Sequence, residues 1–198
     1  MSDAFTRLAH ALEVLPNIGA KSAQRIAYHL LQHNRKGTEN LIKCLQEALK
    51  QVSHCNRCNT FCESNLCEIC ADPRRDQSKL MIVQMPLDVQ IMESANCHDG
   101  LYFVLMGAVQ PLQNMDLNSV AIRQLLARLE DSQLREIILG TNFNAEGETT
   151  AFVLQEILKK FSFKLTRLAK GIPLGGELEF VDAGTLAQAF YERKLIGI

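Results

Sequence analysis

The sequence lacks the features that direct a chain into or across a membrane. None of its 198 residues lie in a stretch that approaches the ~20 uncharged apolar residues of a membrane-spanning helix. The segment beginning Met1-Ser2-Asp3 also lacks the basic-then-apolar layout of a secretory signal peptide. We therefore expect a cytoplasmic protein. Its apolar content of 47% is enough for a real core and excludes wholesale disorder.

The sequence also lacks an excess of charge of either sign. Its 21 Lys and Arg against 22 Asp and Glu give a net charge of −1, which disfavours a nucleic-acid binder when the chain is taken whole. The charges are unevenly distributed, however. Residues 1–53 carry seven basic and four acidic side chains (+3), whereas residues 76–198 carry eleven and fifteen (−4). This asymmetry predicts two parts with different partners.

A nucleotide-binding phosphate loop is absent too, because no Gly-x-x-x-x-Gly-Lys-Ser/Thr motif occurs. Near the end of the chain, residues 171–182 contain three glycines and a proline and predict a structured loop. Residues 178–182 are an apolar run ending in Asp, which predicts a strand. A helix over 185–193 and an apolar tail over 194–198 follow, and we expect the tail to pair as a strand or dock on another subunit.

What the sequence does have is a cluster of cysteines. Two Cys-x-x-Cys pairs, Cys55/Cys58 and Cys67/Cys70, are separated by eight residues. An odd total of seven cysteines without an export signal argues against a disulfide framework. Two such pairs can offer four thiolates to one cation, and zinc prefers four thiolates in structural sites. Four protein ligands leave no position for water, so we predict one structural Zn²⁺.

Two neighbours of this cluster are rival ligands. His54 directly precedes the first pair, and Cys62 lies between the pairs without a partner at the same spacing. We interpret Cys62 as a spare thiol. The remaining cysteines, Cys44 and Cys97, are expected to pack rather than to react.

Apolar spacing predicts three helices before the cysteine cluster. Ser2 would cap the first, which Pro16 would end, and the second would start near Gly19. Thr38 would cap the third. Its expected buried residues are Leu41, Leu45, Ala48, Leu49 and Val52.

The junction between the first two helices, residues 15–23, resembles a helix-hairpin-helix motif, with Asn17 where that motif usually has glycine. Asparagine tolerates the left-handed conformation that such a turn needs, and Gly19 would admit another backbone. Lys21 and Arg25 are four residues apart and share one face near the positive end of the second helix. These parts could hold a DNA phosphate without reading sequence. The alternative is an ordinary turn with solvated basic side chains.

In the second half, short apolar runs alternate with helical patterns, which predicts a mostly parallel sheet covered by helices. The expected strands are 80–83, 101–105, 136–139 and 164–168, and the expected helices are 87–94, 120–129 and 148–161. In sheets of this kind the functional crevice lies at the carboxyl ends of the strands.

Polar residues follow two of these strands. Gln84 follows the first, Asn142 and Asn144 follow the third, and Glu146 and Glu148 come next. This part resembles the Toprim fold of topoisomerases and bacterial primases, which places a glutamate and an Asp-x-Asp pair at these positions to hold magnesium. Here three carboxylates are replaced by neutral amides, which are poor ligands for a hard cation. We therefore expect a Toprim scaffold without two-metal catalysis. The alternative is a plain α/β domain whose two glutamates favour a helix start.

The order of these parts, together with Gly175-Gly176-Glu177-Leu178-Glu179, resembles the RecR family of bacterial recombination mediators over nearly the full length. The resemblance implies a multidomain α+β chain with four parts. These are helix-hairpin-helix (1–53), four-cysteine zinc finger (54–72), Toprim (78–172) and a C-terminal segment (173–198). It also implies a cytoplasmic, nucleoid-associated protein that forms dimers or ring-like tetramers.

The same resemblance implies a function without catalytic residues. RecR proteins act with RecO and RecF to load RecA onto gapped DNA in recombinational repair. By this resemblance Lys21, Arg25 and Gly19 would contact DNA. The partner-binding residues would be Glu146, Gln84 and Asn142, with Glu146 on an acidic face that meets RecO.

Two other functions stay open from the sequence alone. One is a magnesium-dependent Toprim nuclease or topoisomerase-like enzyme, and the other is a zinc-stabilised interaction module that never touches DNA. A zinc ion with four thiolates adds about −2 to the charge. We therefore expect a single subunit to bind DNA weakly, and the affinity to depend on assembly.

Overall fold

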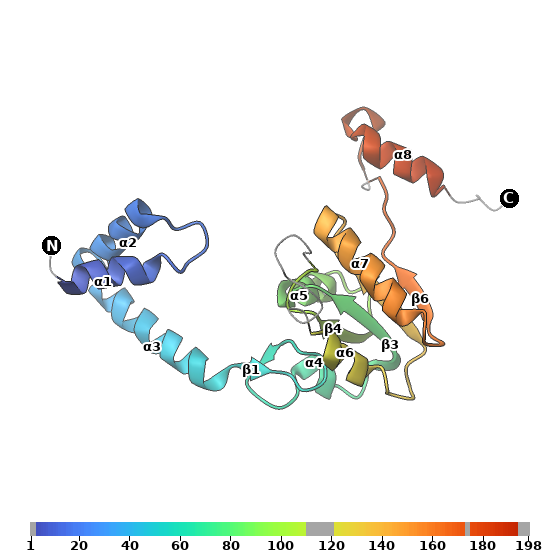
Figure 1. Ribbon diagram of the computed structural model, residues 1–198, viewed down its shortest axis with the longest axis horizontal. Coiled ribbons are helices and arrows are strands. Elements are labelled where there is room, and N and C mark those ends of the chain that lie inside the picture. The colour runs from blue at the N-terminus through green and yellow to red at the C-terminus, as the bar shows by residue number, and fades with distance from the viewer. Residues whose placement is uncertain (1–2, 110–120, 173–174, 194–198) are drawn as a thin grey trace. The chain divides into compact units, whose positions relative to one another are not determined.

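The computed structural model describes residues 3–109, 121–172 and 175–193 (Figure 1). The chain forms two compact units, Met1–Val52 and Ser53–Ile198. None of the helices in the described part of the chain is long and apolar enough to cross a membrane.

The first unit consists of α1 (Asp3–Leu12), α2 (Ala20–Gln32) and α3 (Arg35–Gln51), coloured blue to cyan in Figure 1. The buried residues among those described in this unit are all alanines: Ala9, Ala23 and Ala27. Their small side chains let α1 and α2 pack closely. The first helix ends four residues before Pro16, and its expected cap, Ser2, lies outside the described residues.

The third helix differs from the prediction in its start and in its burial. It begins at Arg35 because the side chain of Asn34 accepts a hydrogen bond from the N–H of Gly37 at 3.1 Å and caps the helix. Thr38 lies inside the helix, where its hydroxyl donates to the carbonyl of Leu30 at 2.9 Å. The row predicted to be buried is exposed within this chain, with Leu49 86% exposed. The helical spacing of these apolar residues was predicted correctly, but no described residue of the first unit covers that face.

The second unit contains a four-stranded parallel sheet in the order β4-β3-β5-β6, which confirms the predicted parallel α/β architecture. The strands are β3 (Asp76–Val83), β4 (Gly100–Val104), β5 (Glu136–Gly140) and β6 (Lys164–Arg167). The strand β3 starts four residues earlier than expected, because Asp76 pairs with Gly100 ahead of a register shift.

Helices cover both faces of this sheet. On one face α6 (Ile122–Arg128) and α7 (Ala145–Leu158) pack over alternate strand residues such as Leu80 and Ile82. On the other face α5 (Pro86–Ser94) packs over Met81 and Val83. Successive residues of β3 therefore enter two different cores, as the two-residue period of a strand requires.

The C-terminal part does not contain the strand predicted over residues 178–182. A 3-10 helix, η2 (Leu178–Phe180), lies there instead and is followed by α8 (Ala183–Tyr191). The carboxylate of Asp182 accepts a hydrogen bond from the N–H of Thr185 at 3.0 Å, so this residue starts a helix rather than ending a strand. The predicted tail over residues 194–198 lies outside the described residues.

Candidate functional site

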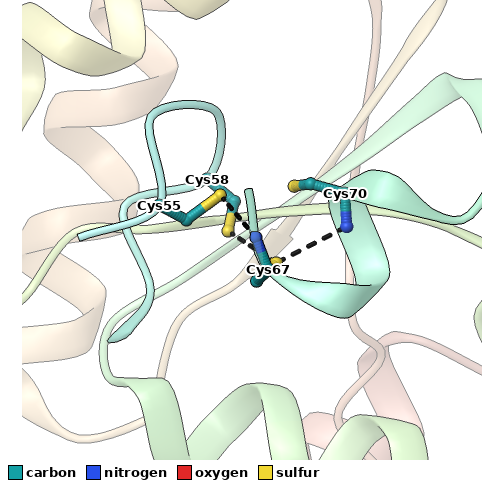
Figure 2. Close-up of side chains that lie close together, drawn as sticks. All are labelled: Cys55, Cys58, Cys67 and Cys70. Carbon is teal, nitrogen blue, oxygen red and sulfur yellow. Dashed lines mark hydrogen bonds between the residues drawn. The ribbon is translucent and has the colours of Figure 1, made fainter. Parts of the chain in front are cut away.

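The two cysteine pairs converge on one point. The first pair lies between the two strands of a short hairpin, β1 (Ser53–His54) and β2 (Phe61–Cys62). In the second pair, Cys67 caps the short helix α4 (Glu68–Ala71) and Cys70 lies within it. The sulfur atoms of Cys55, Cys58, Cys67 and Cys70 all lie within 4.8 Å of one another (Figure 2). Tetrahedral zinc with Zn–S bonds of about 2.3 Å requires sulfur separations of about 3.8 Å. The four cysteines are therefore positioned to bind one metal ion.

Hydrogen bonds hold these sulfurs in place. The N–H of Cys67 donates to Sγ of Cys55 at 3.3 Å, and the N–H of Cys70 donates to Sγ of Cys67 at 3.4 Å (Figure 2). The hydrogen bond between Cys58 and Cys67, with a second one to Cys70 and burial, raises the pKa of the Cys58 thiol. A bound cation reverses this effect, since a coordinating thiol is deprotonated outright. The donor set fits Zn²⁺ in a closed, structural site.

Neither rival ligand belongs to this cluster. Nδ1 of His54 lies 3.0 Å from the carbonyl oxygen of Asn59, and Sγ of Cys62 donates to the carbonyl of Ser64 at 2.8 Å. The more distant Cys44 and Cys97 are both exposed, so the prediction that they pack is wrong.

The zinc-binding segment is bonded directly to the edge of the parallel sheet. The N–H of Val104, at the end of β4, donates to the carbonyl of Cys58 at 2.8 Å. The side chain of Asn59 returns a bond to the Val104 carbonyl, also at 2.8 Å. Asn59 has a φ of 64°, which turns the chain back toward the sheet. No local pattern in the sequence indicates this junction, because it joins residues 45 apart.

The turn between α1 and α2 has the predicted left-handed residue. Asn17 has a φ of 64°, and the N–H of Ile18 donates to the Leu15 carbonyl at 3.1 Å. Gly19 was predicted to admit the close approach of another backbone, but it does not do so within this chain. Its φ is −88°, and a Cβ added there would meet no described atom within 4 Å. The chain itself therefore does not supply the close backbone approach predicted at Gly19.

The start of α2 is open and positively charged. Lys21 and Arg25 are both exposed, and neither forms an ion pair with a residue in the described ranges. The first turn of α2 contains no acidic residue. The free N–H groups and the positive end of the helix dipole therefore face solvent together with two cations, an arrangement that can hold an anion.

At the carboxyl edge of the sheet, two of the three amides that replace the Toprim carboxylates are hydrogen-bonded within the fold through their side chains. Gln84 is only 4% exposed, and its Oε1 accepts a hydrogen bond from the N–H of Asn142 at 2.8 Å. The side chain of Asn144 accepts from the N–H of Gly147 at 2.9 Å. This cap starts α7 at Ala145, three residues before the predicted Glu148.

The glutamates of this edge have separate surroundings. Glu148 lies 2.8 Å from Nη1 of Arg167 and 2.7 Å from Nζ of Lys170, and these cations hold its pKa below the usual range. Glu146 is exposed. Between them, Gly147 is needed, because a Cβ there would overlap the Asn142 carbonyl oxygen. Within the described residues, the four-cysteine cluster is the one group of three or more His, Cys, Asp or Glu able to hold a metal.

These parts define a modular protein with a helix-hairpin-helix turn, a four-cysteine zinc finger and a Toprim domain, and family models match each part. The matches are RecR helix-hairpin-helix (residues 5–49), RecR four-cysteine zinc finger (52–72), Toprim (78–169) and RecR C-terminal (171–194). Several relatives are similar over almost the whole chain. The chain belongs to the RecR family.

Three relatives illustrate the similarity, and each is named recombination protein RecR. The protein of Neisseria meningitidis serogroup A is 62% identical over 98% of this chain and 95% of its own length. That of Neisseria gonorrhoeae is 60% identical over 98% of this chain and 95% of its own length. That of Chromobacterium violaceum is 52% identical over 96% of each.

Proposed function

We propose that this chain is a non-enzymatic, DNA-binding recombination mediator that acts with RecO and RecF to load RecA onto gapped or single-stranded DNA. The name of its relatives and the domains that the family models match support a role in recombination. The carboxyl edge of the sheet carries the non-enzymatic part of the proposal. There Gln84 and Asn144 are neutral amides bonded to the backbone, and Glu148 is neutralised by two cations of the chain itself.

The DNA contacts are proposed at the start of α2. Lys21 and Arg25 would bind backbone phosphates, since both are exposed and unpaired among the described residues. The open space around Gly19 would let a phosphate reach the free N–H groups of the helix. Contacts of this kind position DNA without reading its sequence.

We further propose that the protein acts as a homo-oligomer, a dimer or a ring-like tetramer. The first unit buries little, yet many of its large apolar side chains are exposed, which is the mark of an association surface. They are Val14, Leu15, Tyr28, Leu31, Leu41, Ile42, Leu45, Leu49 and Val52. Association would also concentrate the modest positive charge of residues 1–53 on DNA.

The proposed partner-binding edge consists of Asn142 and Glu146, both of which are exposed. An acidic side chain here suits a basic protein partner such as RecO. Gln84 was expected to contact the partner as well, but it is buried. We propose that it acts by holding Asn142 in position. The domains are proposed to span 1–53, 54–72, 78–172 and 173–198.

A nicking assay on supercoiled plasmid tests the non-enzymatic proposal. The purified protein, incubated with Mg²⁺ or Mn²⁺, should leave the plasmid supercoiled. Metal-dependent nicking or relaxation that co-purifies with the protein would instead show an active Toprim enzyme.

A further inference from the structure

An exposed aromatic ring lies at the centre of the proposed partner-binding edge. Phe143, in the loop between β5 and α7, is 43% exposed. The guanidinium carbon of Arg167 lies 4.8 Å from its ring centre, and Nζ of Lys170 lies 5.1 Å away. Both distances are within the range of favourable cation–π contacts. The ring therefore contacts the two cations with part of its surface and is exposed to solvent over the rest.

The loop that carries Phe143 is held on both sides. The preceding residue, Asn142, donates its N–H to Gln84, and the following residue, Asn144, caps α7. The two cations under the ring are themselves held by Glu148. Little freedom is left for the ring to lose on binding, and pre-organised aromatic side chains of this kind dominate the energy of protein interfaces.

A hollow beside the ring adds a second feature. It has a volume of about 520 Å³, and its lining includes Phe143, Lys170, Asp182, Thr185 and Gln188. Hydrogen bonds from the side chain and the N–H of Thr185 lower the pKa of Asp182, so its carboxylate stays charged. Arg167 and Lys170 share the single negative charge of Glu148, which leaves one positive charge. The carboxylates of Asp182 and the exposed Glu146 add two negative charges, so the net charge offered to a partner is negative.

We propose that Phe143 is the apolar anchor of the partner-binding edge, inserted into an apolar pocket of a protein partner whose rim is basic. This inference rests on the proposed function, since it assigns the anchor of the same edge. The acidic balance of residues 76–198 disfavours the other occupant of an exposed aromatic ring, a base of single-stranded nucleic acid.

The test measures binding of RecO to the full-length protein by calorimetry without DNA, comparing Phe143→Ala with Phe152→Ala. Phe152 is a matched control, because it is 62% exposed on α7 and no described cation lies over its ring. We expect Phe143→Ala to weaken binding at least tenfold and Phe152→Ala to change it less than twofold. Phe143→Leu keeps the apolar bulk but loses the cation–π contact, so its loss of RecO affinity should lie between those of the two alanine variants. This variant keeps the test valid if Phe143→Ala does not fold.

Two further measurements separate the possible failures. If Glu146→Lys weakens RecO binding but Phe143→Ala does not, the anchor is wrong while the proposed edge stands. If neither change affects binding, both are wrong. Binding of a fluorescent dT oligonucleotide to the same variants gives the other outcome: a loss confined to the oligonucleotide would assign the ring to nucleic acid and overturn the proposal.

Discussion

The side chain of Gln84 accepts a hydrogen bond from the backbone N–H of Asn142 at 2.8 Å and thereby joins the carboxyl ends of β3 and β5. A Toprim enzyme would use these two positions to bind a metal. In this chain the same positions shape a loop, and the nearby Glu148 is paired with Arg167 at the end of β6 and with Lys170 just after it. Asn142, Phe143 and Glu146 are exposed at this edge.

This arrangement predicts that restoring one carboxylate does not restore a metal site. In Gln84→Glu a carboxylate would be buried where the neutral amide now lies, with the Asn142 N–H as the one hydrogen-bond donor shown for it among the described residues. We expect a loss of about 1–3 kcal/mol in the free energy of unfolding. Thermal melting should show the loss with and without Mg²⁺. Recovery of the melting temperature specifically with Mg²⁺ would mean that the edge still binds metal.

Removal of zinc should release the edge of the sheet as well as the zinc-binding segment. The Val104 N–H is bonded to Cys58, and the Val104 carbonyl to Asn59. After chelation, hydrogen exchange should accelerate over residues 55–71 and at Val104, while Ile137 in the central β5 stays protected. Asn59→Ala should speed exchange at Val104 with one zinc still bound per chain. If the protection of Val104 is unchanged in both cases, the stability of the sheet edge does not depend on the metal site, and the prediction is wrong.

Replacement of Lys21 and Arg25 by alanine should weaken DNA binding uniformly across sequences. Loss of two phosphate contacts per chain reduces the slope of log K against log salt by about 2. Salt-dependent fluorescence anisotropy measures this slope. The matched control, Arg35→Ala with Lys36→Ala, removes two exposed cations at the start of α3. Equal effects of the two double variants would point to general attraction rather than to a site at α2.

A partly buried ion pair predicts a specific pH dependence of stability. Arg75 pairs with Glu93, and the hydroxyl of Tyr102 donates to the same carboxylate at 2.7 Å. The bond from Arg75, and then the one from Tyr102, lower the pKa of Glu93 against the opposing effect of burial. A lowered pKa stabilises the fold above about pH 4.5, and this contribution is lost as the pH falls through the lowered value.

Glu93→Gln should therefore be less stable than the unchanged protein at pH 7 by about 1 kcal/mol, a modest figure because Glu93 is partly exposed. The two melting temperatures should differ by about 2–4 °C. The difference should shrink as the pH falls below about 4.5 and through the lowered pKa of Glu93, because the unchanged protein then loses the charge that the variant already lacks. A difference in stability that grows as the pH is lowered would contradict this prediction.

The sequence predicted the elements with strong local patterns and missed the contacts between distant residues. Apolar runs identified all four parallel strands, and the cysteine spacing identified the metal cluster. The strand predicted at residues 178–182 was wrong because Asp182 caps a helix, a local bond that outweighs the apolar run before it. The Gln84–Asn142 bond spans 58 residues and the Glu148–Arg167 pair spans 19, so no local pattern reveals either. The apolar face of α3 was visible in the sequence, but its exposure depends on what packs beside it.

The central claim, a non-enzymatic mediator of RecA loading, is tested most directly by following RecA filament formation on gapped DNA coated with single-strand-binding protein, in the presence of RecO. We expect little filament without this protein and fast formation when it is added, with Lys21→Ala/Arg25→Ala and Glu146→Lys each reducing the rate and the DNA remaining uncut. A rate that does not respond to the added protein, or DNA that is cleaved during the reaction, would contradict the proposed function.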